Sequence, residues 1–282
     1  MKVRPIVVPG VAVKVPPQLL VGAGAPETLI AGLIQLRVPT VLYIHDVNFG
    51  NCLGNFATHP LLLCIANSNF MTSRFMETFG IRPYVIPPFV DQEKYRVATN
   101  RRKVVFIGLV PEKGVELAFQ LAEKRSDIPF EFVESWPINR ADFFDFERRA
   151  NRLGNVTVRR RVADMRSIYG MAKILLVPSV CEEAWGRICT EAQCSGVPVL
   201  ASNTGGLPES VGPGGLLVDV HAPLTEWLVA LSTLWDDTAA YLRLSEAALM
   251  HSRRKEIQFS YVVEELLRLL VAHVSFCGAH KR

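Results

Sequence analysis

Apolar residues along this chain fall into two kinds of segment that alternate. Short runs rich in Val and Ile have the length and composition of buried strands, and the longer segments between them repeat apolar residues at helical spacing. This alternation predicts an α/β fold in which mostly parallel sheets are covered by helices on both faces. The predicted strands are 6–8, 40–45, 62–66 and 84–86 in a first group and 104–108, 130–133, 156–158, 174–178, 197–201 and 215–218 in a second.

The predicted helices follow these strands. They cover 27–36, 69–79, 115–124, 142–153, 165–171 and 187–195, and helix propensity is also strong across 223–274. The glycine-rich piece 21–27 lacks the order of a phosphate-binding loop, and we interpret it as a plain loop that enters a helix.

A polar stretch at 90–103 has no apolar period and follows two consecutive prolines, as is typical of a connection between domains. We therefore expect two doubly wound domains and a terminal segment. They are an N-terminal domain over 1–95, a C-terminal domain over 96–260, and a C-terminal helix and tail over 261–282 that packs back on the N-terminal domain.

Composition narrows the class of protein. The chain has 282 residues, 49% hydrophobic and 21% charged, which fits a globular protein with two modest cores. Its net charge of +4 is too small to indicate nucleic-acid binding, although a clustered excess would suit an anionic ligand or a membrane surface. Six scattered cysteines without a C-x-x-C pair, and no apolar run approaching about 20 residues, lead us to expect a cytoplasmic protein that contacts membranes at most peripherally.

The segment PSVCEEAWGRICTEAQCSGVPVLASNTGG, residues 178–206, carries the clearest chemistry. A helix that begins after Gly186 directs backbone N–H groups and its positive dipole end toward an anion such as a diphosphate. Glu183 before this helix and Glu191 within it supply carboxylates that accept hydrogen bonds from sugar hydroxyls. We expect the later glycine pair, Gly205 and Gly206, to let the backbone approach the ligand closely.

This segment resembles the donor-site signature of retaining glycosyltransferases of family 4, whose hallmark is E-x7-E. Glu183 and Glu191 have that spacing, and Glu182 does not. The resemblance implies a GT-B fold, with two Rossmann-like doubly wound domains on either side of a cleft and a reduced N-terminal domain. It also implies donor contacts from Trp185, Gly186 and Arg187.

Further segments carry the same resemblance. The segment 105–114 places Lys113 where the family grips the donor phosphates, but Leu109 stands where the family has Arg. We expect that Leu109→Arg would restore this cation if the side chain has space. In 156–169, Arg161 and Val162 hold the positions that contact the nucleotide base, while 159–161 is equally interpretable as a solvated basic run. His45, at a strand end, matches a histidine that faces the transferred sugar.

The resemblance implies a hexosyltransferase of glycan biosynthesis that uses a UDP-sugar or GDP-sugar as co-substrate and a carbohydrate or lipid-linked acceptor. The sequence lacks Asp-x-Asp, so we expect neither a metal ion nor a cofactor. In this interpretation His45 and Glu183 are catalytic, and Glu191 holds the ribose of the donor.

An alternative is a catalytically weak or inactive GT-B relative that binds a nucleotide sugar or a partner protein. Leu109 and the short first domain favour it. Family members open with a strand and a Gly-Gly loop that this sequence lacks, so we expect either a reduced acceptor domain or a reading frame that begins upstream of Met1. The sequence names neither the base nor the sugar nor the acceptor.

Overall fold

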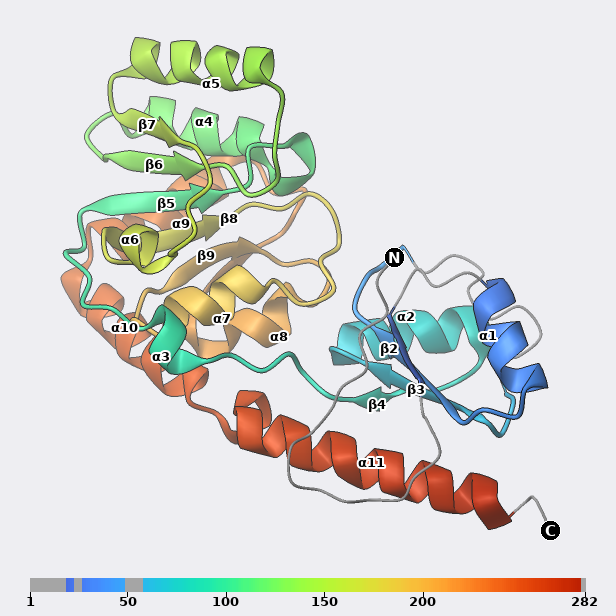
Figure 1. The fold of residues 1–282 in the computed structure, drawn as a ribbon. Coiled ribbons are helices and arrows are strands. Elements are labelled where there is room, and N and C mark those ends of the chain that lie inside the picture. Colours follow the sequence, from blue (N-terminus) through green and yellow to red (C-terminus); the bar gives the residue numbers. More distant parts are fainter. Residues whose placement is uncertain (1–18, 23–26, 49–57, 280–282) are drawn as a thin grey trace. The chain divides into compact units, whose positions relative to one another are not determined.

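The structure is a computed structural model that describes residues 19–22, 27–48 and 58–279. The chain forms two compact units. The smaller unit combines Met1–Pro88 with Phe259–Arg282, and the larger unit is Phe89–Gln258 (Figure 1). The strand predicted at 6–8 lies outside the described residues.

The larger unit is built on a parallel sheet with the strand order β10-β9-β8-β5-β6-β7 (Figure 1). Its first strand in the chain, β5, lies in the interior of the sheet. The chain adds β6 and β7 on one side of β5 and then β8, β9 and β10 on the other, so the strand order reverses between β5 and β8. Open α/β sheets bind ligands at the carboxyl ends of the strands at such a switch point. The strands are β5 (Lys103–Ile107), β6 (Phe130–Val133), β7 (Val156–Arg159), β8 (Ala172–Val177), β9 (Val199–Ser202) and β10 (Gly215–Val218).

Helices cover both faces of this sheet because successive strand residues point to opposite sides. In β5, Val104 and Phe106 join one core cluster, and Val105 and Ile107 join the other. The first core lies under α4 (Val115–Lys124), α5 (Arg140–Leu153), α9 (Leu224–Trp235) and α10 (Thr238–Ser252). The second lies under α3 (Gln92–Tyr95), α6 (Arg166–Tyr169), α7 (Arg187–Gln193) and α8 (Leu207–Val211).

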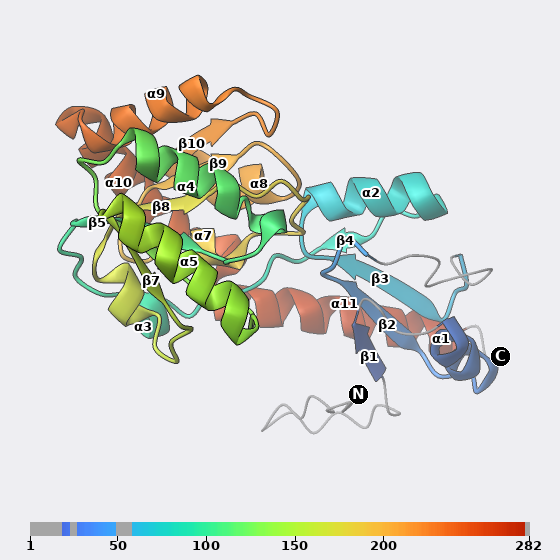
Figure 2. The same ribbon diagram turned by 90° about the horizontal axis from the view of Figure 1, so that it is seen from above.

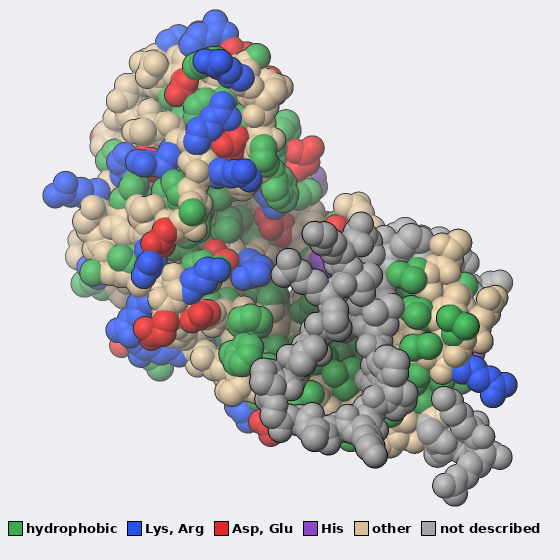
Figure 3. Space-filling view, in the orientation of Figure 1, with side chains coloured by type: hydrophobic (Ala, Val, Ile, Leu, Met, Phe, Trp, Pro, Cys, Tyr) green, Lys and Arg blue, Asp and Glu red, His purple; other side chains and the backbone are tan. Residues whose placement is uncertain are grey.

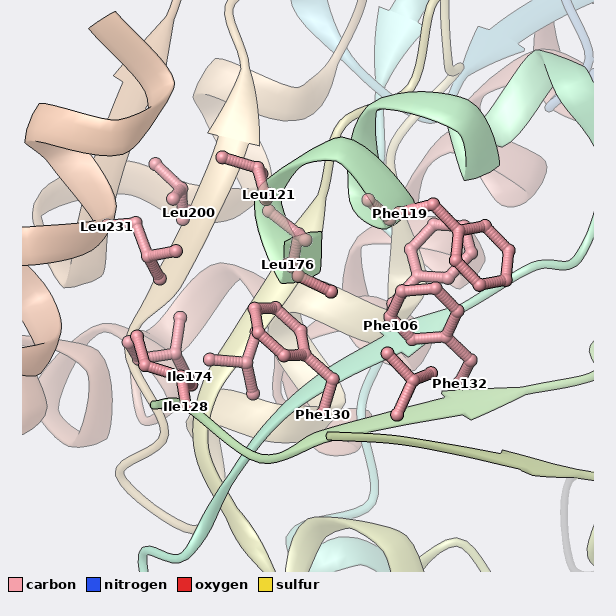
Figure 4. Packing of buried hydrophobic residues seen from close by; sticks show 14 of the residues in the cluster. Phe106, Phe119, Leu121, Ile128, Phe130, Phe132, Ile174, Leu176, Leu200 and Leu231 are labelled. Carbon is pink, nitrogen blue, oxygen red and sulfur yellow. The ribbon is translucent and has the colours of Figure 1, made fainter. Parts of the chain in front are cut away.

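Aromatic side chains form the centre of the first core (Figure 4). The ring of Phe132 meets those of Phe106 and Phe119 edge-on, with centroids 5.1 and 4.8 Å apart. All three side chains are almost completely buried. Edge-to-face packing of this kind adds to the stability that burial of the rings already gives, and it holds α4 firmly on β5 and β6.

The smaller unit has a parallel sheet in the order β1-β2-β3-β4. Figures 1 and 2 show α2 and α11 on opposite faces of it. On the α11 side, Val262 and Leu269 pack against Val41, Ile65 and Ile86. The C-terminal helix therefore completes a core formed by the first part of the chain. The elements are β1 (Leu19–Gly22), β2 (Thr40–Ile44), β3 (Leu62–Ala66), β4 (Tyr84–Val85), α1 (Glu27–Gln35), α2 (Asn69–Phe79) and α11 (Phe259–Ala279).

Most predicted elements are present, but β1, α3 and α8 were not predicted, and the C-terminal part was divided too coarsely. β1 contributes Val21 and Gly22 from the piece that we interpreted as a plain loop. The helical stretch 223–274 is three helices. One break falls at Asp237, whose side chain caps α10 by accepting a hydrogen bond from Ala240 N at 3.0 Å. Within the described residues, no helix has the length and apolar character that a membrane crossing requires.

Candidate functional site

An ion pair lies at the carboxyl edge of the larger sheet, at its switch point. Lys113 ends a short 3₁₀ turn (Pro111–Lys113) that follows β5, and Glu183 lies in the loop that follows β8. Lys113 Nζ is 2.9 Å from Glu183 Oε1, and the two side chains are 16% and 12% exposed. Ser179 Oγ also donates a hydrogen bond to Glu183 Oε1, at 2.5 Å. The structure thus brings together two residues that the sequence placed at the donor site.

Two glycines of the loop after β5 make this pairing possible. Gly108 has a φ of +125°, and a Cβ there would lie 2.9 Å from Lys113 Cβ. Gly114 has a φ of +77°, and its Cβ would overlap the carbonyl oxygen of Pro178. Both positions favour glycine for conformation and for space. The lack of a side chain at Gly114 lets the loop after β5 lie directly on the loop after β8, and the lack of one at Gly108 leaves room for the Lys113 side chain.

The second glycine loop also packs on Glu183. Gly205 has a φ of +58°, and a Cβ there would lie 2.5 Å from the backbone N and O of Glu183. Gly206 N donates a hydrogen bond to Glu183 O at 2.6 Å. These glycines thus permit a close approach to the protein backbone, and the expected approach to the ligand stays a prediction. They fix the position of the catalytic candidate Glu183.

Glu191 lies on α7 and is 8% exposed. Its Oε2 accepts a hydrogen bond from Tyr169 OH at 2.9 Å, and its Oε1 is 3.7 Å from Arg187 Nη2 one helical turn away. Burial raises the pKa of the Glu191 carboxyl, and the hydrogen bonds from Tyr169 and Tyr95 with the charge of Arg187 act in the opposite direction. Neither tyrosine was expected, because the motif alone does not show which hydroxyls pack beneath α7.

Trp185 faces the interior. The residue is only 4% exposed, and its Nε1 donates a hydrogen bond to Thr190 Oγ1 at 3.1 Å. The guanidinium of Arg254 lies over the Trp185 ring, 5.5 Å from its centroid. The indole therefore supports the loop from within, and the donor contact expected of Trp185 stays a prediction. Arg187 is different, because its side chain is 57% exposed.

Gly186 immediately precedes α7, which has seven residues. Its φ is +83°, and a Cβ there would lie 2.5 Å from Leu207 Cδ2. A larger residue would therefore disturb both the backbone conformation and the packing of α7 on α8. The tight turn follows Glu183 by three positions and directs the chain from the loop into the helix.

Glu134 ties the loop after β6 to the loop after β7. Its residue is only 5% exposed, and its carboxylate accepts hydrogen bonds from Ile138 N at 3.0 Å, Arg161 N at 3.2 Å and Arg160 Nη1 at 3.0 Å. Burial alone would raise the pKa of Glu134, but these donors outweigh it and lower the pKa. A charged carboxylate thus holds the two loops together.

The basic residues 159–161 are not a uniformly solvated run. Arg159 Nε pairs with Glu131 Oε1 at 2.6 Å, and the Arg160 guanidinium lies 3.6 Å from the ring centroid of Phe143 as well as on Glu134. These two side chains are therefore structural. Arg161 is exposed, although its backbone N donates a hydrogen bond to Glu134. Val162 is partly buried against the second core.

Trp136, in the same loop as Glu134, is 58% exposed. Lys113 Nζ lies over its ring, 5.3 Å from the centroid. This exposure excludes the Trp136 side chain from the core. Its ring stands at the edge of the sheet, beside the ion pair.

The surroundings of Leu109 argue against our expectation that Leu109→Arg would restore the missing cation. It is 2% exposed and belongs to the first core cluster, which also contains Phe106 and Val115. Its side chain therefore fills apolar space, and no room exists there for a guanidinium directed at a phosphate. Among the described residues, Lys113 is the cation whose ammonium contacts both Glu183 and Trp136.

His45 belongs to the smaller unit, where it follows β2. It is exposed, and its ring centroid lies 5.9 Å from that of Tyr43. No group of His, Cys, Asp and Glu side chains within the described ranges has the arrangement of a metal site. Basic and acidic side chains are interspersed on the visible face of the larger unit (Figure 3), in keeping with the small net charge.

Solved structures define the class of the fold. The crystal structure of Anabaena Alr3699/HepE in complex with UDP aligns with a TM-score of 0.77 and 20% identity, over 90% of this chain and 78% of that one. Sucrose-phosphate synthase from Thermosynechococcus elongatus aligns with a TM-score of 0.70 and 18% identity, over 91% and 74%. The fold is GT-B with two Rossmann-like domains, as the sequence predicted.

Residues 90–250 match the family described as "Glycosyl transferases group 1". The chain belongs to this family. D-inositol 3-phosphate glycosyltransferase of Corynebacterium glutamicum (strain R) is 44% identical over 93 residues, or 32% of this chain and 22% of that protein. The protein of the same name from Paenarthrobacter aurescens (strain TC1) is 29% identical over 215 residues, or 67% and 52%. The chain thus spans between about a fifth and about half of the length of these relatives.

Proposed function

We propose that this protein is a retaining hexosyltransferase that moves a sugar from a nucleoside diphosphate donor to an acceptor hydroxyl without a metal ion. The observation that carries the proposal is the ion pair of Lys113 and Glu183 at the switch point of the larger sheet. A cation that binds phosphate oxygens stands there beside a carboxylate that accepts hydrogen bonds from sugar hydroxyls. A nucleotide sugar presents both kinds of group to one site.

The residues near the pair take the remaining roles. Lys113, together with the backbone at Gly186 and the exposed Arg187 side chain, holds the diphosphate. Glu183 orients the hydroxyls of the transferred sugar. Glu191 holds the ribose, with Tyr169 fixing its carboxylate at 2.9 Å.

The ends of the donor extend to two further places. Arg161 and Val162 contact the base, since they lie in the loop that Glu134 fixes beside the sheet edge. His45 contacts the transferred sugar. Trp185 acts through the backbone that its buried side chain supports.

In the proposed reaction the bond between the anomeric carbon and the diphosphate oxygen breaks, and the electron pair leaves with the diphosphate. The acceptor hydroxyl attacks the anomeric carbon from the face that the diphosphate leaves, and the departing phosphate takes the hydroxyl proton. Retention of configuration follows from attack on that face. Lys113 and the donors around it stabilise the charge that develops on the leaving group. Glu183 and Glu191 act here as the two glutamates of the E-x7-E motif, as the resemblance to family 4 implies.

The relatives suggest which compounds to test first. Anabaena Alr3699/HepE is crystallised with UDP-glucose, and the name of the D-inositol 3-phosphate glycosyltransferases includes D-inositol 3-phosphate. We therefore take UDP-glucose as the first donor and D-inositol 3-phosphate as the first acceptor, with GDP-glucose and other UDP-sugars as further donors.

The test is a turnover assay with the purified full chain. Release of UDP is measured with and without the acceptor and with and without EDTA, and the configuration of the product is determined by NMR. Transfer that persists in EDTA and yields the retained anomer supports the proposal. Inversion, or activity that EDTA abolishes and Mg²⁺ restores, contradicts it.

Binding of UDP without any turnover on a panel of donors and acceptors would instead favour a non-catalytic GT-B relative. One observation supports that second candidate: Leu109 stands where the family pattern has Arg, so the site holds one cation fewer than that pattern. The two candidates differ in chemistry and agree in ligand, so binding and turnover must both be measured.

A further inference from the structure

Trp136 is the feature of the site that the proposed roles leave unexplained. A tryptophan loses favourable burial when its ring faces solvent, yet this residue is 58% exposed at the edge where ligands of such sheets bind. Its ring also meets the Lys113 ammonium at 5.3 Å. The aromatic surface thus adjoins the group proposed to hold the diphosphate.

The loop that carries Trp136 is fixed in place. Glu134 accepts a hydrogen bond from Ile138 N at 3.0 Å, which closes the loop around Trp136. The same carboxylate accepts a hydrogen bond from Arg161 N at 3.2 Å, so the loops after β6 and β7 share one buried anchor. The backbone of the loop that carries the exposed ring is therefore tied to the backbone at Arg161 before any ligand arrives.

The order of the strands gives the order of the groups along the edge. Strands β8, β5, β6 and β7 are neighbours in that sequence. Glu183 follows β8, Lys113 follows β5, Trp136 follows β6, and Arg161 follows β7. A donor with its diphosphate at Lys113 and its sugar at Glu183 therefore extends its nucleoside toward Trp136 and Arg161.

We propose that Trp136 binds the heterocyclic base of the donor by stacking, an inference that rests on the proposed function. An indole face and a neighbouring guanidinium are the two side-chain surfaces on which bases stack, and stacking tolerates different bases because each presents a flat π-face. The Lys113 ammonium beside the ring holds the diphosphate to which the nucleoside is joined. Trp136 is thus a binding residue with a stronger effect on affinity than on the choice between uracil and guanine.

Calorimetric titrations with UDP, GDP and inorganic pyrophosphate test this assignment, because pyrophosphate engages Lys113 and has no base. We expect Trp136→Ala to weaken UDP and GDP binding on the order of tenfold and to leave pyrophosphate binding unchanged. Trp136→Phe should retain most of the affinity. Phe144→Ala, which removes another exposed aromatic ring from the same unit, is the matched control and should bind like wild type.

Two results would overturn the inference. Equal weakening of UDP and pyrophosphate by Trp136→Ala would show that the ring acts only by positioning Lys113. Unchanged affinity for all three ligands would show that the ring contacts none of them. Failure of the proposed function looks different. Wild-type protein that binds UDP and shows no turnover would contradict the transferase proposal and leave the stacking inference standing, whereas wild-type protein that binds neither UDP nor GDP would contradict both. Thermal melts establish that each variant is folded.

Discussion

Lys113 Nζ lies 2.9 Å from Glu183 Oε1 in the absence of ligand, although the two residues follow different strands. Each side chain is largely shielded from solvent, so the attraction is stronger than that of a surface pair. The pair holds the ammonium in position and balances its charge until a phosphate arrives. Substitution of either residue therefore leaves the charge of the other unbalanced. Substitutions of Lys113 and of Glu183 should have opposite effects on nucleotide binding.

Lys113→Ala should abolish most nucleotide binding. UDP at a hundred times its Kd stabilises the folded wild type by about 2.7 kcal/mol, which corresponds to a Tm increase on the order of 5 °C. Differential scanning fluorimetry should show that Lys113→Ala loses most of this increase. Lys124→Ala, which removes an exposed lysine at the end of α4, is the control and should keep it. A full increase in Lys113→Ala would place the phosphates elsewhere.

Glu183→Gln should reduce kcat while UDP affinity is preserved or improved. The substitution removes the charge that balances Lys113, so a diphosphate meets a less compensated cation. The transferred sugar, which UDP lacks, loses a hydrogen bond to a charged group, and we expect kcat to fall about tenfold to a hundredfold. Glu182→Gln is the neighbouring control. A parallel loss of kcat and UDP affinity in Glu183→Gln would contradict a role restricted to the sugar.

The stability of Glu191→Gln relative to wild type should depend on pH. Burial raises the pKa of this carboxyl above its ordinary value of 4.5, so the folded protein binds the proton more tightly than the unfolded chain. The stabilising contribution is complete below the ordinary pKa and is lost as pH rises through the folded-state pKa.

Because glutamine stays neutral, the variant should gain stability relative to wild type as pH increases from about 4 to about 8. Chemical denaturation at several pH values measures the difference, with the exposed Glu226→Gln as the control. A difference that falls with increasing pH would mean that the ionised carboxylate is favoured in the folded state.

Leu109→Arg should destabilise the protein and should not increase kcat. The leucine is 2% exposed within an apolar cluster, so the guanidinium would be buried without a partner or would force the loop after β5 to move. A loss of stability on the order of 3 kcal/mol or more is expected. Leu109→Met, which conserves apolar volume, should remain close to wild type. A stable Arg variant with faster turnover would show that the side chain reaches the phosphates.

Local patterns predicted much of the fold. Helix 69–79 was predicted with the bounds that it has in the structure, where Ser68 Oγ caps it by accepting a hydrogen bond from Met71 N and Gly80 ends it with a φ of 69°. β1 was missed because four residues beside a glycine-rich piece resemble a loop when their partner strand is unknown. Its pairing with β2 is a tertiary contact that no local pattern contains.

The contacts of the candidate site were harder to predict than its residues. The motif predicted that Lys113, Glu183 and Glu191 belong to one site, and the structure pairs Lys113 with Glu183, whereas the place of Glu191 in the site stays a prediction. Spacing does not show which way a side chain turns, so the inward direction of Trp185 and Leu109 emerged only from the packing. The anchoring of two loops by Glu134 likewise depends on strands that are adjacent in the sheet and separate in the chain.

The discontinuous smaller unit has a consequence for synthesis. Because α11 supplies Val262 and Leu269 to its core, the ribosome must translate all of the larger unit before that core has its last members. The larger unit is one continuous segment and is able to fold as soon as it emerges, as domains generally do. Until α11 arrives, the apolar face that includes Val41 and Ile65 lacks its cover. Nascent chains stalled before residue 259 should therefore bind chaperones through the N-terminal part that contains Val41 and Ile65.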